Sequence, residues 1–82
     1  MENEKIIEII AQIAGMNTED IELDDELKIL GINSLETVEL LLEIEETFEI
    51  TFDISDLDID ELGSIESIIN LTNQYIIRRD DL

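Results

Sequence analysis

The stretch Gly31–Phe48 constrains the fold more than any other part of the chain, because it joins a glycine, two helix-starting residues and a long helical pattern. Asn33 is a good N-cap, and Glu36 follows three residues later, as in a capping box. We therefore expect a helix over residues 33–49, with Ser34 as its first helical residue and its hydroxyl facing solvent. In the alternative register Ser34 is itself the cap, and a backbone N–H then partly occupies the hydroxyl.

The expected helix carries three stripes when its residues are placed about 100° apart on a wheel. The stripe expected to face the core consists of Leu40, Leu41, Ile44 and Phe48. An acidic ridge consists of Glu36, Glu39, Glu43 and Glu46. On the far side of this ridge lie Leu35, Val38 and Leu42, which either pack against other helices or form an exposed docking strip. The wheel alone does not choose between these alternatives.

Helical spacing of apolar residues predicts two more long helices. Isoleucines recur through Asn3–Ala14, and Gly15 is a plausible stop for that helix. Ser64 is expected to cap a final helix from Ile65 to about residue 77, with two arginines where cations favour a helix C-terminus. The apolar positions expected along this final helix are Ile65, Ile68, Ile69, Leu71, Thr72, Tyr75 and Ile76.

Two connections complete the expected fold. Residues 17–32 form a long loop, with one helical turn expected at 24–29. Its expected core anchors are Ile21, Leu23, Leu27, Ile29, Leu30 and Ile32. A short third helix, capped by Ser55 and stopped by Gly63, is expected to bury Leu57, Ile59 and Leu62. The 82 residues are thus predicted to form one all-α domain, residues 1–82, with three longer helices and one short helix.

Composition excludes several classes of function. The chain has no cysteine and no histidine, so it lacks a thiol nucleophile, a thiolate metal site and the usual base at neutral pH. Its net charge of −19 argues against nucleic acid and anionic membranes, favours partners with basic surfaces, and predicts stability that rises with salt. The N-terminal residues do not resemble a signal peptide, and no stretch reaches membrane-spanning length. We therefore expect a cytoplasmic protein.

Two other site types fit the sequence poorly. An acidic cluster invites a calcium site; its members are Asp53, Asp56, Asp58, Asp60, Glu61 and Glu66. A calcium loop that began at Asp56 would need glycine at its sixth position and glutamate at its twelfth, where this chain has Glu61 and Ser67. Ser34 lacks both a histidine base and the Gly-x-Ser-x-Gly elbow of a serine nucleophile, so a simple helix cap is the more serious alternative to a functional serine.

The segment Gly31-Ile32-Asn33-Ser34-Leu35-Glu36-Thr37-Val38-Glu39-Leu40, followed by Glu45-Glu46-Thr47-Phe48, resembles the acyl carrier protein family. The signature of that family is Gly-x-Asp-Ser-Leu followed by an acidic recognition helix. The likeness spans most of the chain, from the isoleucine-rich first helix through the long anchored loop to the last helix. It implies an acyl-carrier-like four-helix bundle that is not itself an enzyme.

The resemblance also implies a site. Ser34 matches the serine to which a separate phosphopantetheinyl transferase attaches 4′-phosphopantetheine, whose thiol holds acyl groups as thioesters. The matching positions for docking on basic patches of acyl synthases and transferases are Leu35, Glu36, Val38, Glu39, Leu42, Glu45 and Glu46. Weaker matches for an acyl pocket are Leu41, Ile44, Ile59 and Tyr75. The implied protein is a monomer that serves fatty-acid or polyketide-type synthesis, with no metal centre.

Two departures from the family pattern bear on these expectations. Asn33 stands where aspartate is usual, which preserves the cap but removes a charge beside the serine. Asp53 stands where proline is frequent, in a segment that is longer and more acidic than usual, which leaves cargo preference open. The rival interpretations are a carrier of amino acids, D-alanine or peptides and, in a different class, an unmodified acidic helical adaptor or weak binder of divalent ions.

Overall fold

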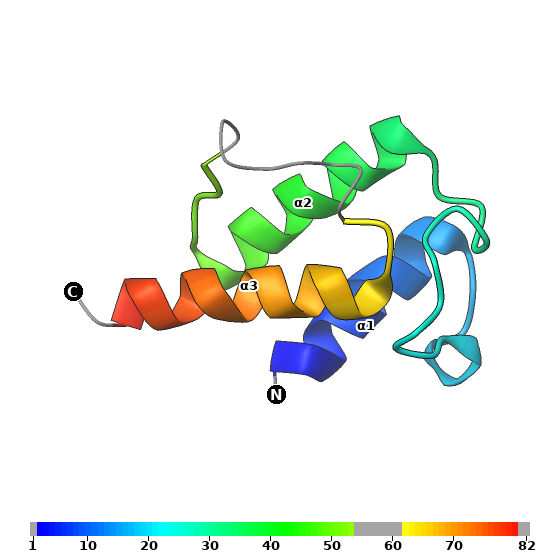
Figure 1. Ribbon diagram of the computed structural model, residues 1–82, viewed down its shortest axis with the longest axis horizontal. Coiled ribbons are helices and arrows are strands. Elements are labelled where there is room, and N and C mark those ends of the chain that lie inside the picture. The colour runs from blue at the N-terminus through cyan, green and yellow to red at the C-terminus, as the bar shows by residue number, and fades with distance from the viewer. Residues whose placement is uncertain (1, 54–61, 81–82) are drawn as a thin grey trace.

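The computed structural model describes residues 2–53 and 62–80, and their regular structure is helical. It consists of α1 (Glu2–Ala14), the 3-10 helix η1 (Thr18–Asp20), α2 (Ser34–Phe48) and α3 (Ile65–Asp80) (Figure 1). The expected all-α fold is confirmed, and no helix within these ranges is long and apolar enough to cross a membrane. The short third helix expected after Ser55, with Leu57 and Ile59, falls outside the described residues, whereas η1 was not expected.

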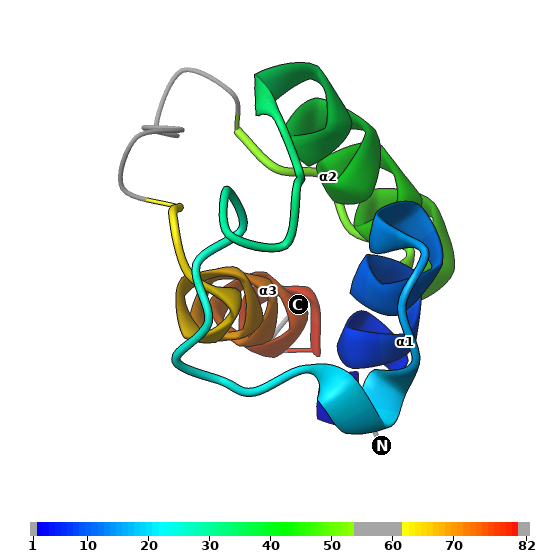
Figure 2. The ribbon, with the colours of Figure 1, turned by 90° about the vertical axis from the view of Figure 1, so that its right-hand side faces the viewer.

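The core is formed by apolar stripes of all three α-helices. The helix α1 packs against both α2 and α3 (Figures 1 and 2). Its stripe centres on Ile6 and Ile10, which are fully buried, and the helix stops at Gly15, whose φ of 70° lies in the left-handed region that favours glycine. Because β-branched isoleucine lowers helix propensity, this tertiary packing is what holds α1 in its helical form.

The predicted apolar positions of α3 are largely confirmed. Ile65, Ile68, Ile69, Thr72 and Ile76 are buried, whereas Leu71 and Tyr75 are half-buried against the core. The buried hydroxyl of Thr72 donates a hydrogen bond to the Ile68 carbonyl at 2.8 Å. This bond avoids the free-energy cost of a buried polar group that has no hydrogen-bond partner. Ser64 caps the helix as expected, since its Oγ accepts a hydrogen bond from the Ser67 N–H at 3.2 Å.

The long loop is tied to the start of α3 through its backbone. The Leu27 N–H donates to the Gly63 carbonyl at 2.8 Å, and the N–H groups of Ile65 and Glu66 donate to the carbonyls of Asp25 and Leu23 at 3.1 and 3.0 Å. These last two N–H groups belong to the first turn of α3, where no carbonyl of the same helix is available to them. The loop therefore supplies the acceptors that the helix lacks.

Two of the six predicted loop anchors are wrong. Leu23 is 51% exposed and Ile29 is 72% exposed, whereas Ile21, Leu27 and Ile32 are buried and Leu30 is half-buried. The backbone bonds to α3 hold this part of the loop without its side chains, which explains why Leu23 can remain in solvent. The expected helical turn at 24–29 is displaced, because the hydrogen-bonded turn lies at residues 27–31.

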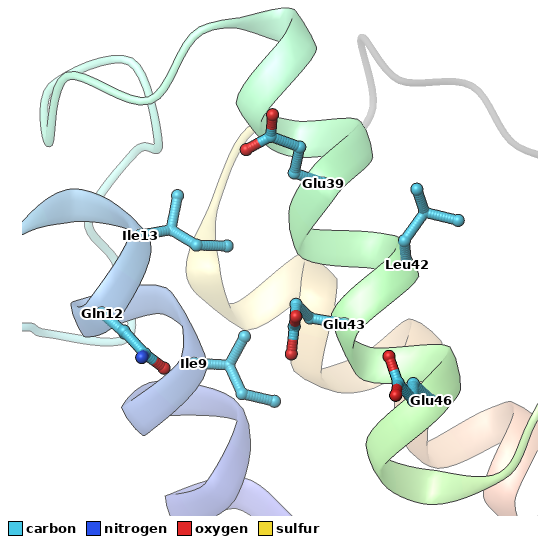
Figure 3. A pocket seen from close by; sticks show the side chains of 7 residues that line it. All are labelled: Ile9, Gln12, Ile13, Glu39, Leu42, Glu43 and Glu46. Atoms are coloured by element: carbon cyan, nitrogen blue, oxygen red, sulfur yellow. The ribbon is translucent and has the colours of Figure 1, made fainter.

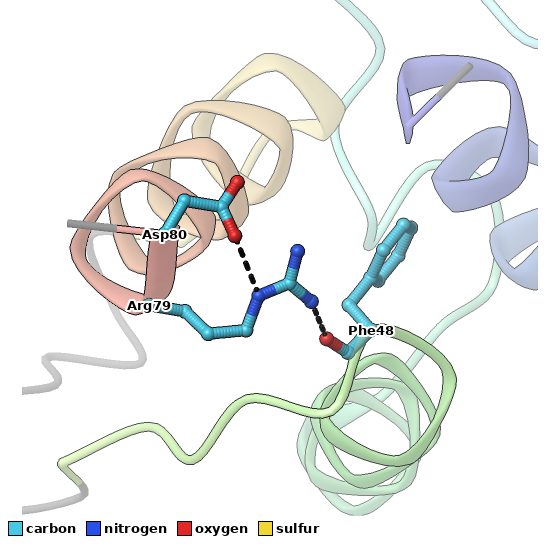
Figure 4. Close-up of polar contacts among 3 residues, drawn as sticks. All are labelled: Phe48, Arg79 and Asp80. Atoms are coloured by element: carbon cyan, nitrogen blue, oxygen red, sulfur yellow. Dashed lines mark hydrogen bonds and ion pairs between the residues drawn. The ribbon is translucent and has the colours of Figure 1, made fainter. Parts of the chain in front are cut away.

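The C-terminal ends of α2 and α3 are joined by an arginine. The helix α3 extends to Asp80, three residues beyond the expected end, and its Arg79 guanidinium donates to the Phe48 carbonyl at the end of α2 (Figure 4). The same guanidinium bonds Asp80 Oδ1 through Nε at 3.0 Å. Phe48 ends the helix with one of the carbonyls that α2 itself leaves unsatisfied, so Arg79 acts as a C-terminal cap from another element.

Candidate functional site

Ser34 is the first residue of α2, with Asn33 as the N-cap. The Asn33 Oδ1 accepts a hydrogen bond from the Glu36 N–H at 2.8 Å, and the Asn33 N–H donates to Glu36 Oε1 at 3.3 Å. This reciprocal pair is the expected capping box, so the register in which Asn33 caps the helix is confirmed. The asparagine also preserves helix entry in the absence of the usual aspartate.

The Ser34 side chain is exposed, and its hydroxyl has no hydrogen-bond partner among residues 2–53 and 62–80. Ser64 at the start of α3 provides a contrast with Ser34, because its hydroxyl accepts a hydrogen bond from the Ser67 N–H and so caps that helix. The difference follows from Asn33, which takes the capping role at α2 and leaves the next side chain uncommitted. A serine in this state is available for chemistry with an external reagent.

The backbone beside this hydroxyl favours an anion. In the first turn of α2 the Glu36 N–H is capped by Asn33 and the Thr37 N–H donates to the Asn33 carbonyl at 2.9 Å. The N–H groups of Ser34 and Leu35 have no acceptor within the described part of the chain. Unpaired N–H groups and the positive end of the helix dipole stabilise a phosphate at such a position.

A hollow of about 370 Å³ opens beside Ser34. It is formed by the long loop, the start of α2 and the residues just before α3, and it is lined by Glu26, Leu27, Lys28, Ile32, Asn33, Ser34, Thr37, Leu62 and Gly63. Lys28 brings one of the four cations of the chain to this hollow, where it also pairs with Glu26 at 3.6 Å. An exposed hydroxyl, two N–H groups that have no acceptor in residues 2–53 and 62–80, a cation and an adjacent hollow fit a phosphate-linked arm at this position.

The two apolar stripes of α2 have opposite environments. Leu40, Leu41 and Ile44 are buried and Phe48 is half-buried, which confirms the predicted core stripe. Leu35, Leu42 and Val38 are 69%, 55% and 39% exposed. Of the alternatives for this second stripe, packing against other helices is therefore wrong, because all three side chains are exposed in the folded chain.

The acidic side chains of α2 also divide into two groups. Glu39, Glu43 and Glu46 are exposed, whereas Glu36 and Glu45 are half-buried and have internal partners. Glu36 completes the capping box, and Glu45 Oε2 accepts a hydrogen bond from the Phe52 N–H at 2.8 Å. Both carboxylates thus stabilise local backbone: the role of Glu36 was expected from the capping-box spacing, whereas that of Glu45 could not be read from a helical wheel because it depends on how the chain leaves the helix.

The four residues expected to line an acyl pocket lie in different environments. Leu41 and Ile44 belong to the packed core, at 6% and 0% exposure. Tyr75 lies half-buried further along α3, where its ring meets Phe52 edge-on at 4.9 Å and its hydroxyl accepts a hydrogen bond from the Asp53 N–H at 3.2 Å. Ile59 falls outside the described residues. The pocket assignment stays a prediction.

The structure brings together three carboxylates of the long loop that no sequence motif marks as a site. Oxygens of Glu22, Asp24 and Asp25 lie within 4.8 Å of one another in the long loop. The Glu22 N–H donates to Asp25 Oδ2 at 2.9 Å, so the local turn accounts for part of this arrangement. The acidic segment weighed as a calcium loop lies mostly at residues 54–61, outside the described ranges.

Comparison of the sequence with known proteins identifies its family. Residues 4–72 match the family model described as a phosphopantetheine attachment site. The acyl carrier protein of Chlorobium phaeovibrioides is 31% identical over 77 residues, covering 93% of this chain and 91% of that protein. The D-alanyl carrier protein of Listeria welshimeri is 36% identical over 69 residues, covering 80% of this chain and 86% of that protein.

A third relative is much longer than this chain. The citrinin polyketide synthase of Monascus ruber is 32% identical over 75 residues, which cover 85% of this chain but 3% of the synthase. Together the family match and the full-length relatives define the class: a carrier protein that uses 4′-phosphopantetheine. The chain belongs to the phosphopantetheine-attachment family, and its resemblance to acyl carrier proteins is confirmed.

Proposed function

We propose that this protein is an acyl carrier protein in which Ser34 receives the 4′-phosphopantetheine arm from a separate transferase. The observation that carries the proposal is the Ser34 hydroxyl at the start of α2, which, like the N–H groups of Ser34 and Leu35 beside it, has no partner among the residues that the structure describes. When bound, the prosthetic group supplies a thiol that holds acyl intermediates as thioesters. Ser34 anchors the arm, and the start of α2 together with Lys28 stabilises its phosphate charge.

The exposed stripe of α2 gives the carrier its docking face. Leu35, Val38 and Leu42 offer apolar contact area, and Glu39 and Glu46 attract basic surfaces. The partners are a phosphopantetheinyl transferase and acyl synthases or transferases of fatty-acid or polyketide-type pathways. The protein itself acts as a cytoplasmic, monomeric substrate of these enzymes and is not an enzyme. The sequence supports this proposal, because it lacks histidine and cysteine, the usual base and the thiol nucleophile at neutral pH.

A mass measurement tests the attachment site. The protein is incubated with coenzyme A and a broad-specificity phosphopantetheinyl transferase, and the intact mass is recorded. We expect a gain of one phosphopantetheine, which disappears in Ser34→Ala and persists in Ser64→Ala. Ser64 is the matched control because it also stands at a helix start but has an engaged hydroxyl. No gain with several transferases, or a gain that survives Ser34→Ala, would contradict the assignment.

A second candidate cargo comes from the D-alanyl carrier relative at 36% identity. A D-alanyl carrier would use the same serine and arm but would be loaded with an amino acid. The holo protein isolated from cells distinguishes the two, because the thioester is released with hydroxylamine and the product is identified by mass. An acyl hydroxamate supports the acyl carrier, and an alanyl hydroxamate supports the alternative.

A further inference from the structure

A second hollow, of about 490 Å³, lies between α1 and α2 (Figure 3). We call it the α1–α2 groove, and it is lined by Ile9, Gln12, Ile13, Glu39, Leu42, Glu43 and Glu46. It shares no lining residue with the hollow beside Ser34. Glu39, Leu42 and Glu46 belong to the docking face proposed above, whereas Glu43 and the three α1 residues do not. The groove therefore extends that face across to α1.

The α1 wall of the groove is largely apolar. Ile9 is 9% exposed and Ile13 is half-buried, and both point from α1 toward α2 in Figure 3. Leu42 adds an apolar side chain on the α2 side and is 55% exposed. Because Leu42 lies outside the core cluster and is mostly exposed, its apolar surface is available to an external side chain.

The α2 wall of the groove is negative. Glu39 and Glu43 project from α2 toward the groove, with Glu46 one turn further along (Figure 3). None of the seven lining residues carries a positive charge, and none of these three glutamates has an ion-pair partner within the described ranges. Carboxylates beside an apolar wall suit an arginine or lysine, whose aliphatic stem packs on isoleucine while its charged end reaches the carboxylates.

We propose that the α1–α2 groove binds an amphipathic basic helix of a partner protein, which places a leucine-sized side chain over Ile9 and Ile13 and flanking arginines or lysines against Glu39 and Glu43. Complementary charge selects this occupant, as in other complexes where a helix lies in a groove. A second copy of the chain is a poor occupant, since each copy carries a net charge of −19. The inference rests on the proposed function for the identity of the partners.

A synthetic peptide tests the groove directly. The probe is a helical peptide of leucine, alanine and arginine with leucines at i, i+4 and i+7 and arginines beside them, and a peptide of the same composition in scrambled order is its control. Amide shifts of the ¹⁵N-labelled unmodified protein are mapped by NMR as each peptide is added. We expect shifts centred on residues 9–13 and 39–46 with the amphipathic peptide and weaker, dispersed shifts with the scrambled one.

Matched variants measure the contribution of the groove. Glu43→Lys reverses a charge inside the groove, and we expect it to weaken the peptide affinity about tenfold. Glu8→Lys makes the same change on an exposed position of α1 that does not line the groove, and we expect an effect below about threefold because separated surface charges are screened. Gln12→Arg places a cation of the protein's own into the groove, so it should weaken binding as Glu43→Lys does.

Several results would overturn the proposal. These are equal losses from Glu43→Lys and Glu8→Lys, equal affinity for the scrambled peptide, shifts confined to residues 34–38, or dimers on peptide-free analytical ultracentrifugation. If Glu43→Lys fails to fold by circular dichroism, Gln12→Arg decides the question alone. Loading of Ser34 with phosphopantetheine is measured on the same samples. A protein that is loaded but does not bind the peptide selectively contradicts the groove proposal and leaves the carrier function standing. A protein that binds the peptide selectively but is not loaded contradicts the proposed carrier function instead.

Discussion

Leu40 and Leu42 stand two positions apart on α2, yet the first is 0% exposed and the second is 55% exposed. The buried face of α2 completes the core, whereas the exposed face shows Leu35, Val38 and Leu42 to solvent. Folding therefore accounts for only part of the apolar content of this helix. For the remainder we propose contact with other proteins, because large apolar side chains that cluster on a surface mark interaction sites.

The charges of the exposed face lead to the same conclusion. Glu39, Glu43 and Glu46 follow one another at spacings of four and three residues, where like charges repel. An exposed face selected for stability alone would alternate glutamate with lysine. The two faces support the proposed docking role: stability accounts for the buried side of α2, and we propose that binding accounts for the exposed side, at a modest cost to the fold.

The largest expected effect compares the two leucines directly. Leu40→Ala should lower the free energy of unfolding by about 2–5 kcal/mol, because it leaves a cavity in a thin core. Leu42→Ala makes the same chemical change on the same helix and should alter the free energy of unfolding by less than about 0.5 kcal/mol. Urea unfolding followed by circular dichroism measures both. Similar losses would refute the contrast between the faces.

An intermediate effect is expected at the start of the helix that both faces share. Asn33→Ala should lower the free energy of unfolding by about 1 kcal/mol, because Glu36 N–H loses its acceptor in the capping box. Asn33→Asp keeps the acceptor and should preserve stability, so it is the matched control. Thermal unfolding of the three proteins in one buffer makes the comparison. A fully stable Asn33→Ala protein would show that the capping box contributes little.

The smallest expected effect is a gain. Glu43→Gln removes repulsion with Glu39 and Glu46 and should raise the free energy of unfolding by about 0.2–0.5 kcal/mol at low ionic strength. Molar salt screens these charges, so the gain should vanish there. Gln12→Glu, which adds a charge to the neighbouring wall of the groove, should have the opposite sign. A gain for Glu43→Gln that persists in molar salt would point to packing instead of charge.

Much of the candidate site could be predicted from local sequence. The capping box needs Asn33 and Glu36 at a spacing of three, and this short-range geometry left the Ser34 hydroxyl uncommitted as expected. The internal roles of Glu45 and Arg79 could not be predicted in the same way. The hydrogen bond to Glu45 depends on where the chain turns after α2. The hydrogen bond from Arg79 forms because the end of α3 lies beside the end of α2. No regular spacing in the sequence predicts contacts of this kind.

The sequence by itself determined the three long helices, the cap at Asn33, the exposed serine and the strongly acidic surface, because each depends on residue type and on spacings within a few turns. Tertiary structure alone decided that Leu42 faces solvent, that Leu23 is held by its backbone and that Ile9 and Ile13 form a groove with Glu39 and Glu43. The physical reason is that a wheel shows which residues share a face, whereas only packing between helices shows which face is already covered.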